Sequence, residues 1–161
     1  MLDSYAELLK GHGWKYFITL NFRREVNEGR AQEISERFVK SLNVRIFGKR
    51  SRKALRLAVS IEKNYSRGYH LHVLAEDPSP RIENKEKRDS FVFRDVIKGC
   101  WQNADVSTAL VELSSPDGKS WFQVIENEDG VIFYVLKEMK KGRYDCLQTN
   151  TLNLDGRRVS I

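Results

Sequence analysis

Two neighbouring segments alternate between apolar and polar residues with a period of two, and this alternation constrains the fold more than any other feature. From Leu55 to Glu62, leucine, valine and isoleucine hold the odd positions, while polar or small residues hold the even ones. The run from Gly68 to Leu74 repeats the pattern. Because strand side chains point alternately to opposite faces, we predict an antiparallel hairpin centred near Ser66 or Arg67.

The second segment carries His70 and His72, two of the three histidines in the chain. Residues two apart in a strand share a face, so both imidazoles leave the sheet side by side. Pairing of the hairpin places Glu62 opposite them on the polar face. Two imidazoles and a carboxylate form a metal-binding set, in which the carboxylate favours Mg or Mn. The alternative is that the two histidines are unrelated residues on a solvated face.

A third segment, from Trp14 to Phe22, also has two distinct faces. Its even positions are apolar, and its other face carries Thr19 and Asn21. Three such segments predict an antiparallel sheet that is backed by helices on one side and open to a ligand on the other.

The rest of the chain adds helices and two further strands. Helices are expected at about Leu2 to Lys10, Ala31 to Phe47, Ser90 to Gln102 and Gly130 to Lys141, and strands at Thr108 to Leu113 and Trp121 to Glu126. The second helix places apolar residues four apart, and Asn127 or Asp129 is the start signal of the last. This order predicts an α+β sandwich of ferredoxin-like or RNA-recognition-like type. The polar tail after Gly142 is not assigned.

Composition predicts one domain over residues 1–161, because 161 residues with 40% hydrophobic content can bury one core. The net charge of +6 indicates an anionic partner, nucleic acid first. Cys100 and Cys146 have no metal-type spacing, which favours a reduced, intracellular protein. No apolar run approaches the roughly 20 residues that span a bilayer, so we expect no membrane contact and a cytoplasmic location.

Basic residues cluster around 45–56 and 137–143, and aromatic residues flank the histidine strand. Basic groups neutralise phosphates and exposed aromatic rings stack on unpaired bases. The candidate DNA contacts are Thr19, Asn21, Arg56, Tyr65, Lys140 and Lys141. The alternative for each aromatic residue is a place in the core, and for helix-terminal cations a contact with the helix dipole.

A second chemical pair lies in the last expected helix, where Tyr134 and Lys137 are three residues apart and share a face. A tyrosine hydroxyl can attack a phosphodiester when a metal ion polarises the phosphate. A lysine one turn away can stabilise the charge that develops. The alternative is an amphipathic helix with a half-buried tyrosine and a solvated lysine.

Together these motifs resemble those of the HUH endonucleases. Phe17-Ile18-Thr19-Leu20-Asn21 resembles motif I, Glu62 with His70-Leu71-His72 resembles motif II, and Tyr134-Val135-Leu136-Lys137 resembles the Tyr-x-x-Lys motif III. The order and spacing look most like the rolling-circle replication initiators (Rep proteins) of plasmids, phages and small DNA viruses. The resemblance implies a five-stranded antiparallel sheet, a Mg- or Mn-dependent nick in single-stranded DNA and a 5′-phosphotyrosine intermediate.

The resemblance also implies a partner and leaves alternatives. The DNA would be a replication origin or a hairpin, and because no Gly-x-x-x-x-Gly-Lys-Ser/Thr motif is present, a host helicase would unwind it. If the host is bacterial, the protein would associate with the nucleoid. A single-tyrosine transposase is the nearest alternative within the superfamily, and Lys137 favours Rep. Outside it stand a non-enzymatic single-strand binder that reads bases with Phe17, Tyr65 and Tyr69, and a nuclease that uses water and forms no adduct.

Overall fold

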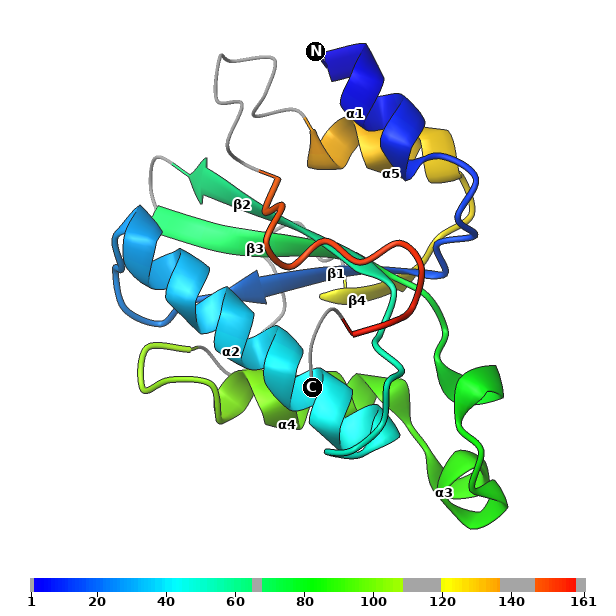
Figure 1. The fold of residues 1–161 in the computed structure, drawn as a ribbon. Helices are drawn as coiled ribbons and strands as arrows, with labels where there is room; N and C mark the ends of the chain where they lie inside the picture. The colour runs from blue at the N-terminus through cyan, green and yellow to red at the C-terminus, as the bar shows by residue number, and fades with distance from the viewer. Residues whose placement is uncertain (1, 65–67, 109–119, 137–146, 159–161) are drawn as a thin grey trace.

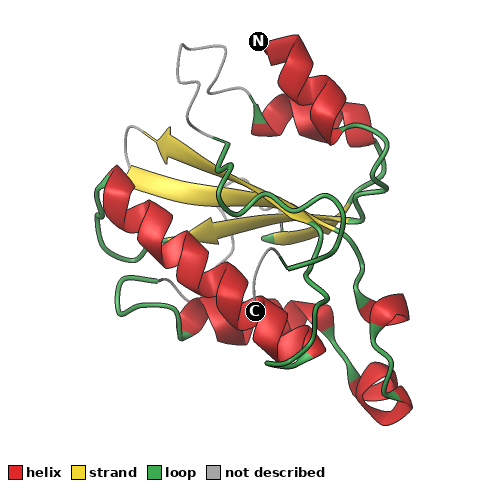
Figure 2. Ribbon diagram, viewed as in Figure 1, coloured by secondary structure: helices red, strands yellow, loops and turns green. Residues whose placement is uncertain are grey.

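A computed structural model describes residues 2–64, 68–108, 120–136 and 147–158. In chain order its elements are α1 (Leu2–Leu9), β1 (Tyr16–Asn21), α2 (Glu28–Phe47), β2 (Leu57–Asn64), β3 (Gly68–Ala75), a 3-10 turn (Ser79–Arg81), α3 (Lys85–Ser90), α4 (Phe93–Gln102), β4 (Phe122–Val124) and α5 (Glu128–Val135). Helices lie on both sides of one sheet (Figure 1), and loops connect them at its ends (Figure 2).

Within the described residues the sheet has four strands, not the expected five, in the order β2-β3-β1-β4, and every pairing is antiparallel. The chain runs β1, α2, β2, β3, α4, β4, which is a ferredoxin-like connection. The predicted α+β class is therefore confirmed. The expected strand from Thr108 to Leu113 lies almost wholly outside the described residues, although Thr108 itself bridges to Phe22.

The β2–β3 hairpin has the predicted register. Glu62 pairs with His70 and Ser60 with His72, and the two strands meet where Asn64 pairs with Gly68. Gly68 has a φ of 74°, a conformation that glycine adopts without strain. The even-numbered residues of both strands therefore share one face of the sheet.

Helices α2 and α4 cover one face of the sheet, here called the first, to which the odd-numbered residues of β2 and β3 point. They enclose the main core there. The apolar stripe of α2 is buried as predicted, and it contains Ala31, Ile34, Phe38, Leu42 and Ile46. The helix begins at Glu28, earlier than expected, because the Asn27 side chain accepts a hydrogen bond from the Arg30 amide and caps the N-terminus. Trp101 of α4 is fully buried against this stripe and meets the Phe38 ring edge to face.

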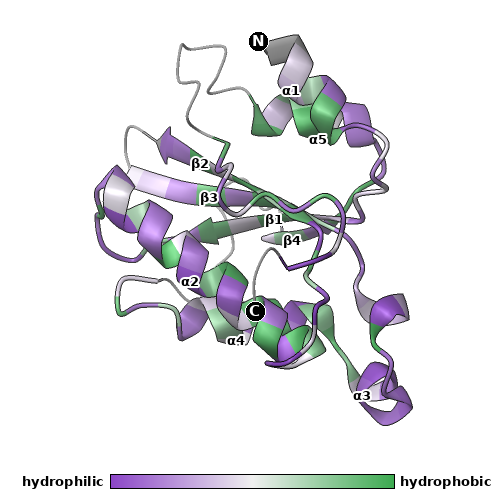
Figure 3. Ribbon diagram, in the orientation of Figure 1, coloured by the Kyte–Doolittle hydropathy of each residue, from purple (hydrophilic) through white to green (hydrophobic). Residues whose placement is uncertain are grey.

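The second face is not open, which corrects the expectation of a sheet covered on one side only. Helices α1 and α5 pack over it (Figure 1), and a second cluster of buried residues lies beneath them. Its sheet residues are Phe17, Ala58 and Leu74, and they pack against Ile132 and Val135 of α5. The hairpin end of β2 and β3 is more hydrophilic (Figure 3). A site on this face is therefore confined between the sheet and α5.

Two other helix predictions need correction. The helix expected from Ser90 begins at Phe93, and a separate helix, α3, precedes it with Asn84 as its capping residue. The helix expected from Gly130 begins at Glu128. Asn127, one of the two predicted start signals, caps it, since its side chain accepts a hydrogen bond from the Gly130 amide. The predicted extension of α5 to Lys141 lies outside the described residues.

No helix among residues 2–64, 68–108, 120–136 and 147–158 combines the length and the apolar character needed to cross a membrane.

Residues 147–158, for which no structure was predicted, run along β2 and the segment that precedes it. The segment bridges to β2 at Ser60 and Leu57. Near its end, the Arg158 guanidinium donates hydrogen bonds to four backbone carbonyl groups, at 2.7–3.0 Å. These carbonyls belong to Asn43, Gly48, Lys49 and Lys53. Arg158 thus ties the C-terminal segment to the end of α2 and the chain that leaves it.

Replacement Arg158→Ala should lower the free energy of unfolding by about 2–4 kcal/mol, because four carbonyl groups lose a charged donor. Urea denaturation followed by circular dichroism would measure this. Arg157→Ala is the matched control: Arg157 is exposed, and its loss should change stability by less than about 0.5 kcal/mol. Equal effects of the two substitutions would contradict the proposed tie.

Candidate active site

The three predicted metal ligands converge at the hairpin end of the sheet. His72 Nε2 lies 2.9 Å from Glu62 Oε2 and 3.1 Å from His70 Nε2, and His70 Nε2 lies 3.7 Å from the same carboxylate oxygen. Glu62 and His72 are buried, and His70 is mostly so. Cross-strand pairing of β2 with β3 brings the three side chains to one face. Residues 62, 70 and 72 therefore form a group that can hold a metal ion.

The geometry of the group fits a bound cation. With metal–ligand distances of about 2.1 Å, neighbouring ligand atoms lie about 3.0–3.4 Å apart. The three separations between the ligand atoms of Glu62, His70 and His72 span 2.9–3.7 Å. Burial of a carboxylate is costly unless it is paired, and a cation between the three atoms would compensate for it. A set of one carboxylate and two imidazoles accepts several divalent metals.

Thr19 and Phe17 of β1 hold the ring of His72 from the other side. Thr19 pairs with His72 across β1 and β3, and its Oγ1 lies 3.2 Å from His72 Nδ1. If Nε2 binds a metal, Nδ1 carries the ring proton and donates a hydrogen bond to the Thr19 hydroxyl. This hydrogen bond fixes the tautomer and the orientation of the His72 ring. The Phe17 ring stacks on His72 with centroids 5.1 Å apart. The contact gives Thr19 a role at the ligand, rather than only toward DNA.

Tyr134 of α5 lies over the same histidine. Its ring centroid is 5.4 Å from that of His72 and 5.8 Å from that of Phe17, and both contacts are edge to face. Ile132 and Val135 are buried beneath the helix, whereas Tyr134 remains 46% exposed. The structure thus brings the expected nucleophile to the expected metal ligands and leaves its side chain accessible to a large substrate.

Ser60 fixes α5 to the sheet at this point, a role that sequence reasoning missed. Its hydroxyl donates a hydrogen bond to the carbonyl of Val135, at 3.1 Å, and both residues are buried. Ser60 also pairs with His72 in the hairpin. Ser60 therefore lies next to two parts of the site. It is the cross-strand neighbour of His72, a candidate metal ligand, and it is hydrogen-bonded to Val135, the residue after Tyr134. The alternation placed Ser60 on this face, but no local pattern indicated its partner.

The other predicted site residues lie in different places. Asn21 is exposed and pairs with His70 across the sheet. Arg56 precedes β2 at the end opposite Glu62, where its guanidinium contacts Glu76 and the carbonyl of His12. Arg56 is thus not brought to the site. Tyr65, Lys137, Lys140 and Lys141 lie outside the described residues.

Comparison with known proteins gives no match: no protein-family model, no curated protein and no solved structure matches the chain. The function of the site is therefore inferred from its residues and their geometry.

Replacement of either histidine, His70→Ala or His72→Ala, should abolish stabilisation by added Mn²⁺. A metal at about 100 times its Kd stabilises a protein by about 2.7 kcal/mol, which corresponds to a rise in Tm of about 5–10 °C at this size. Scanning fluorimetry with and without Mn²⁺ would measure the rise. His12→Ala, which removes the third histidine away from the site, should keep it. A full rise in either site variant would exclude these ligands.

Thr19→Val should weaken metal binding by about 10- to 100-fold, because it removes the acceptor that orients His72 while keeping a side chain of similar shape. Isothermal titration with Mn²⁺ would give the affinities. Thr19→Ser retains the hydroxyl and should bind the metal nearly as the original chain does. If the valine variant also binds normally, the hydroxyl does not position the ligand.

Proposed function

We propose that this protein is a metal-dependent endonuclease that nicks and rejoins single-stranded DNA through a 5′-phosphotyrosine at Tyr134. The observation that carries the proposal is the approach of Tyr134 to the buried Glu62, His70 and His72 group, with His72 in contact with the tyrosine ring. A purely structural role for Tyr134 in the core would not account for the carboxylate and the two imidazoles grouped beside it. A solvated tyrosine would have no need of Ser60 to hold its helix to the sheet.

The chain's own residues account for most of the reaction. Tyr134 gives its phenolic proton to solvent water, to which the residue is 46% exposed, and its oxygen attacks the phosphorus while the bond from phosphorus to the 3′ oxygen breaks. That oxygen takes a proton from water and leaves as a 3′-hydroxyl, and the 5′ phosphate stays on Tyr134. A divalent metal, when bound, polarises the phosphate. Lys137 would stabilise the charge that develops, and attack by a 3′-hydroxyl on the phosphotyrosine reseals the strand.

Initiation of rolling-circle replication is the role that these features support best, with Mg²⁺ or Mn²⁺ as the metal. A carboxylate among the ligands favours these ions, and the net charge of +6 favours a nucleic-acid partner. The DNA would be an origin or a hairpin, opened by a host helicase in the cytoplasm. Lys137 favours a Rep protein over a single-tyrosine transposase, which remains the alternative.

Tyr134→Phe should abolish strand cleavage and the covalent adduct while the metal-induced rise in Tm persists. The substitution removes one oxygen from an exposed position and leaves the packing of α5 unchanged. The assay incubates the protein with labelled single-stranded oligonucleotides and Mn²⁺, followed by denaturing electrophoresis and mass spectrometry of the adduct.

Tyr16→Phe is the matched control. Tyr16 packs against Phe93 on the other face of the sheet, where burial and then the charge of Asp77 raise the pKa of its hydroxyl. The variant should form the adduct normally. Cleavage by Tyr134→Phe without an adduct would identify a nuclease that uses water, and an adduct on another tyrosine would exclude Tyr134. DNA binding by the original chain without any cleavage would support a non-enzymatic single-strand binder.

A further inference from the structure

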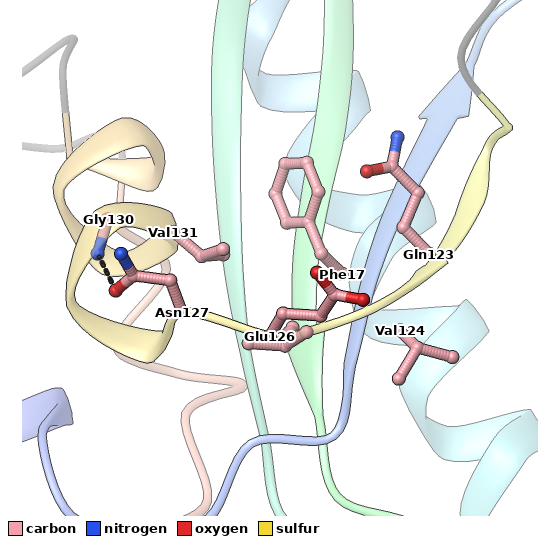
Figure 4. A pocket seen from close by; sticks show the side chains of 8 residues that line it. Phe17, Gln123, Val124, Glu126, Asn127, Gly130 and Val131 are labelled. Atoms are coloured by element: carbon pink, nitrogen blue, oxygen red, sulfur yellow. Dashed lines mark hydrogen bonds between the residues drawn. The ribbon is translucent and has the colours of Figure 1, made fainter.

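A pocket of about 250 Å³ lies between β4 and the first turns of α5. Its lining residues are Phe17, Gln123, Val124, Ile125, Glu126, Asn127, Gly130 and Val131. Figure 4 shows the Phe17 ring rising from the sheet within this pocket and Val131 facing it from α5. No residue of the metal group lines this pocket, so the site already described does not account for it.

The pocket is continuous with the site in two ways. Phe17 forms part of its wall and also contacts the rings of both His72 and Tyr134. Along α5, Asn127, Val131 and Tyr134 follow one another at intervals of four and three residues, so they lie on one face of the helix. An occupant of the pocket would therefore be a close neighbour of a phosphate held between Tyr134 and the metal ligands.

The charges around the pocket favour a base over a phosphate. Glu126 lines it, and Glu128 and Asp129 stand in the first turn of α5. Carboxylates repel a phosphate group, but they accept hydrogen bonds from the amino groups of bases. The apolar side of the pocket, formed by Phe17, Ile125 and Val131, offers a ring and aliphatic surfaces against which a base can stack.

The polar groups of the pocket are mainly acceptors. The Gln123 side-chain nitrogen donates to the carbonyl of Ser120, at 2.9 Å, which holds the amide in place. Figure 4 shows its oxygen on the side of Phe17, and Glu126 lines the same pocket. Two acceptors match a base that presents an amino group, namely adenine, cytosine or guanine. Thymine presents carbonyl oxygens on both sides of its single ring donor and is disfavoured.

We propose that this pocket binds the base of a nucleotide that flanks the scissile phosphate, and that Glu126 selects against thymine there. This inference rests on the proposed function, since it concerns DNA cleaved by Tyr134. Glu126 is a specificity-determining residue in this scheme, because it touches the base and not the reacting atoms. The pocket thus gives the chain a means of choosing where in a single strand the cut falls.

The test uses the whole protein, Mn²⁺ and a pool of single-stranded oligonucleotides of random sequence. The strand linked to Tyr134 and the released strand are both sequenced, which gives the base on each side of the cut. Thymine should be depleted about ten-fold at one flanking position, the discrimination of a good base contact. Glu126→Gln, whose amide can also donate to a carbonyl, should remove most of this depletion from the adducts that form.

Asp129→Asn is the matched control, because it removes one negative charge from the first turn of α5, three residues from Glu126 and outside the pocket, and it should keep the depletion. A second variant, Val131→Phe, fills the pocket and should lower adduct yield at least ten-fold without changing the rise in Tm caused by Mn²⁺. Normal adduct yield in that variant would overturn the proposal. The proposal would also be overturned if the adduct forms without thymine depletion, or if thymine is depleted equally in the Glu126→Gln variant. Either of these two results would leave the proposed nicking function intact. Absence of any adduct from the original chain would overturn both.

Discussion

The register of the β2–β3 hairpin is the constraint on which both the fold and the site depend. A shift of one residue would move every side chain of a strand to the opposite face. In β2 it would take Val59 and Ile61 out of the core beneath α2 and α4, and in β3 it would take Leu71 and Val73. Burial of each such side chain stabilises the fold by about 1.5–3 kcal/mol. The same register places Glu62 opposite His70. The hydrophobic core therefore holds the three candidate metal ligands in position.

The parts of the molecule that could be predicted from sequence are those in which local periodicity decides the structure. Alternation specified the hairpin, its register and the convergence of Glu62 with both histidines. Spacing of four specified the buried stripe of α2, and Asn127 marked the start of α5. In each case the pattern of burial along one element contains the information, so that a single sequence suffices.

The parts that could not be predicted depend on contacts between distant elements. Phe17 stands among the polar positions of β1, where it breaks the alternation, and only the packing of α5 explains its burial. The hydrogen-bond partners of the Thr19 and Ser60 hydroxyls could not be predicted, because they depend on the strand order and on the position of α5. Residues 147–158 show no periodic pattern of apolar residues from which a structure could be predicted. Hydrogen bonds from side chains to backbone groups help to hold the segment in place, as those of Arg158 illustrate.

The two faces of the sheet therefore make different contributions to the site. The large core under α2 and α4 fixes the strands, and with them the candidate metal ligands, whereas a smaller cluster fixes α5. Tyr134 is 46% exposed, so the helix that carries it is held through its buried side, by Ile132, Val135 and the hydrogen bond from Ser60. This arrangement leaves room beside the tyrosine. The pocket next to Phe17 and Val131 follows from it, because a helix that buried Tyr134 more deeply would also close the space available to a base.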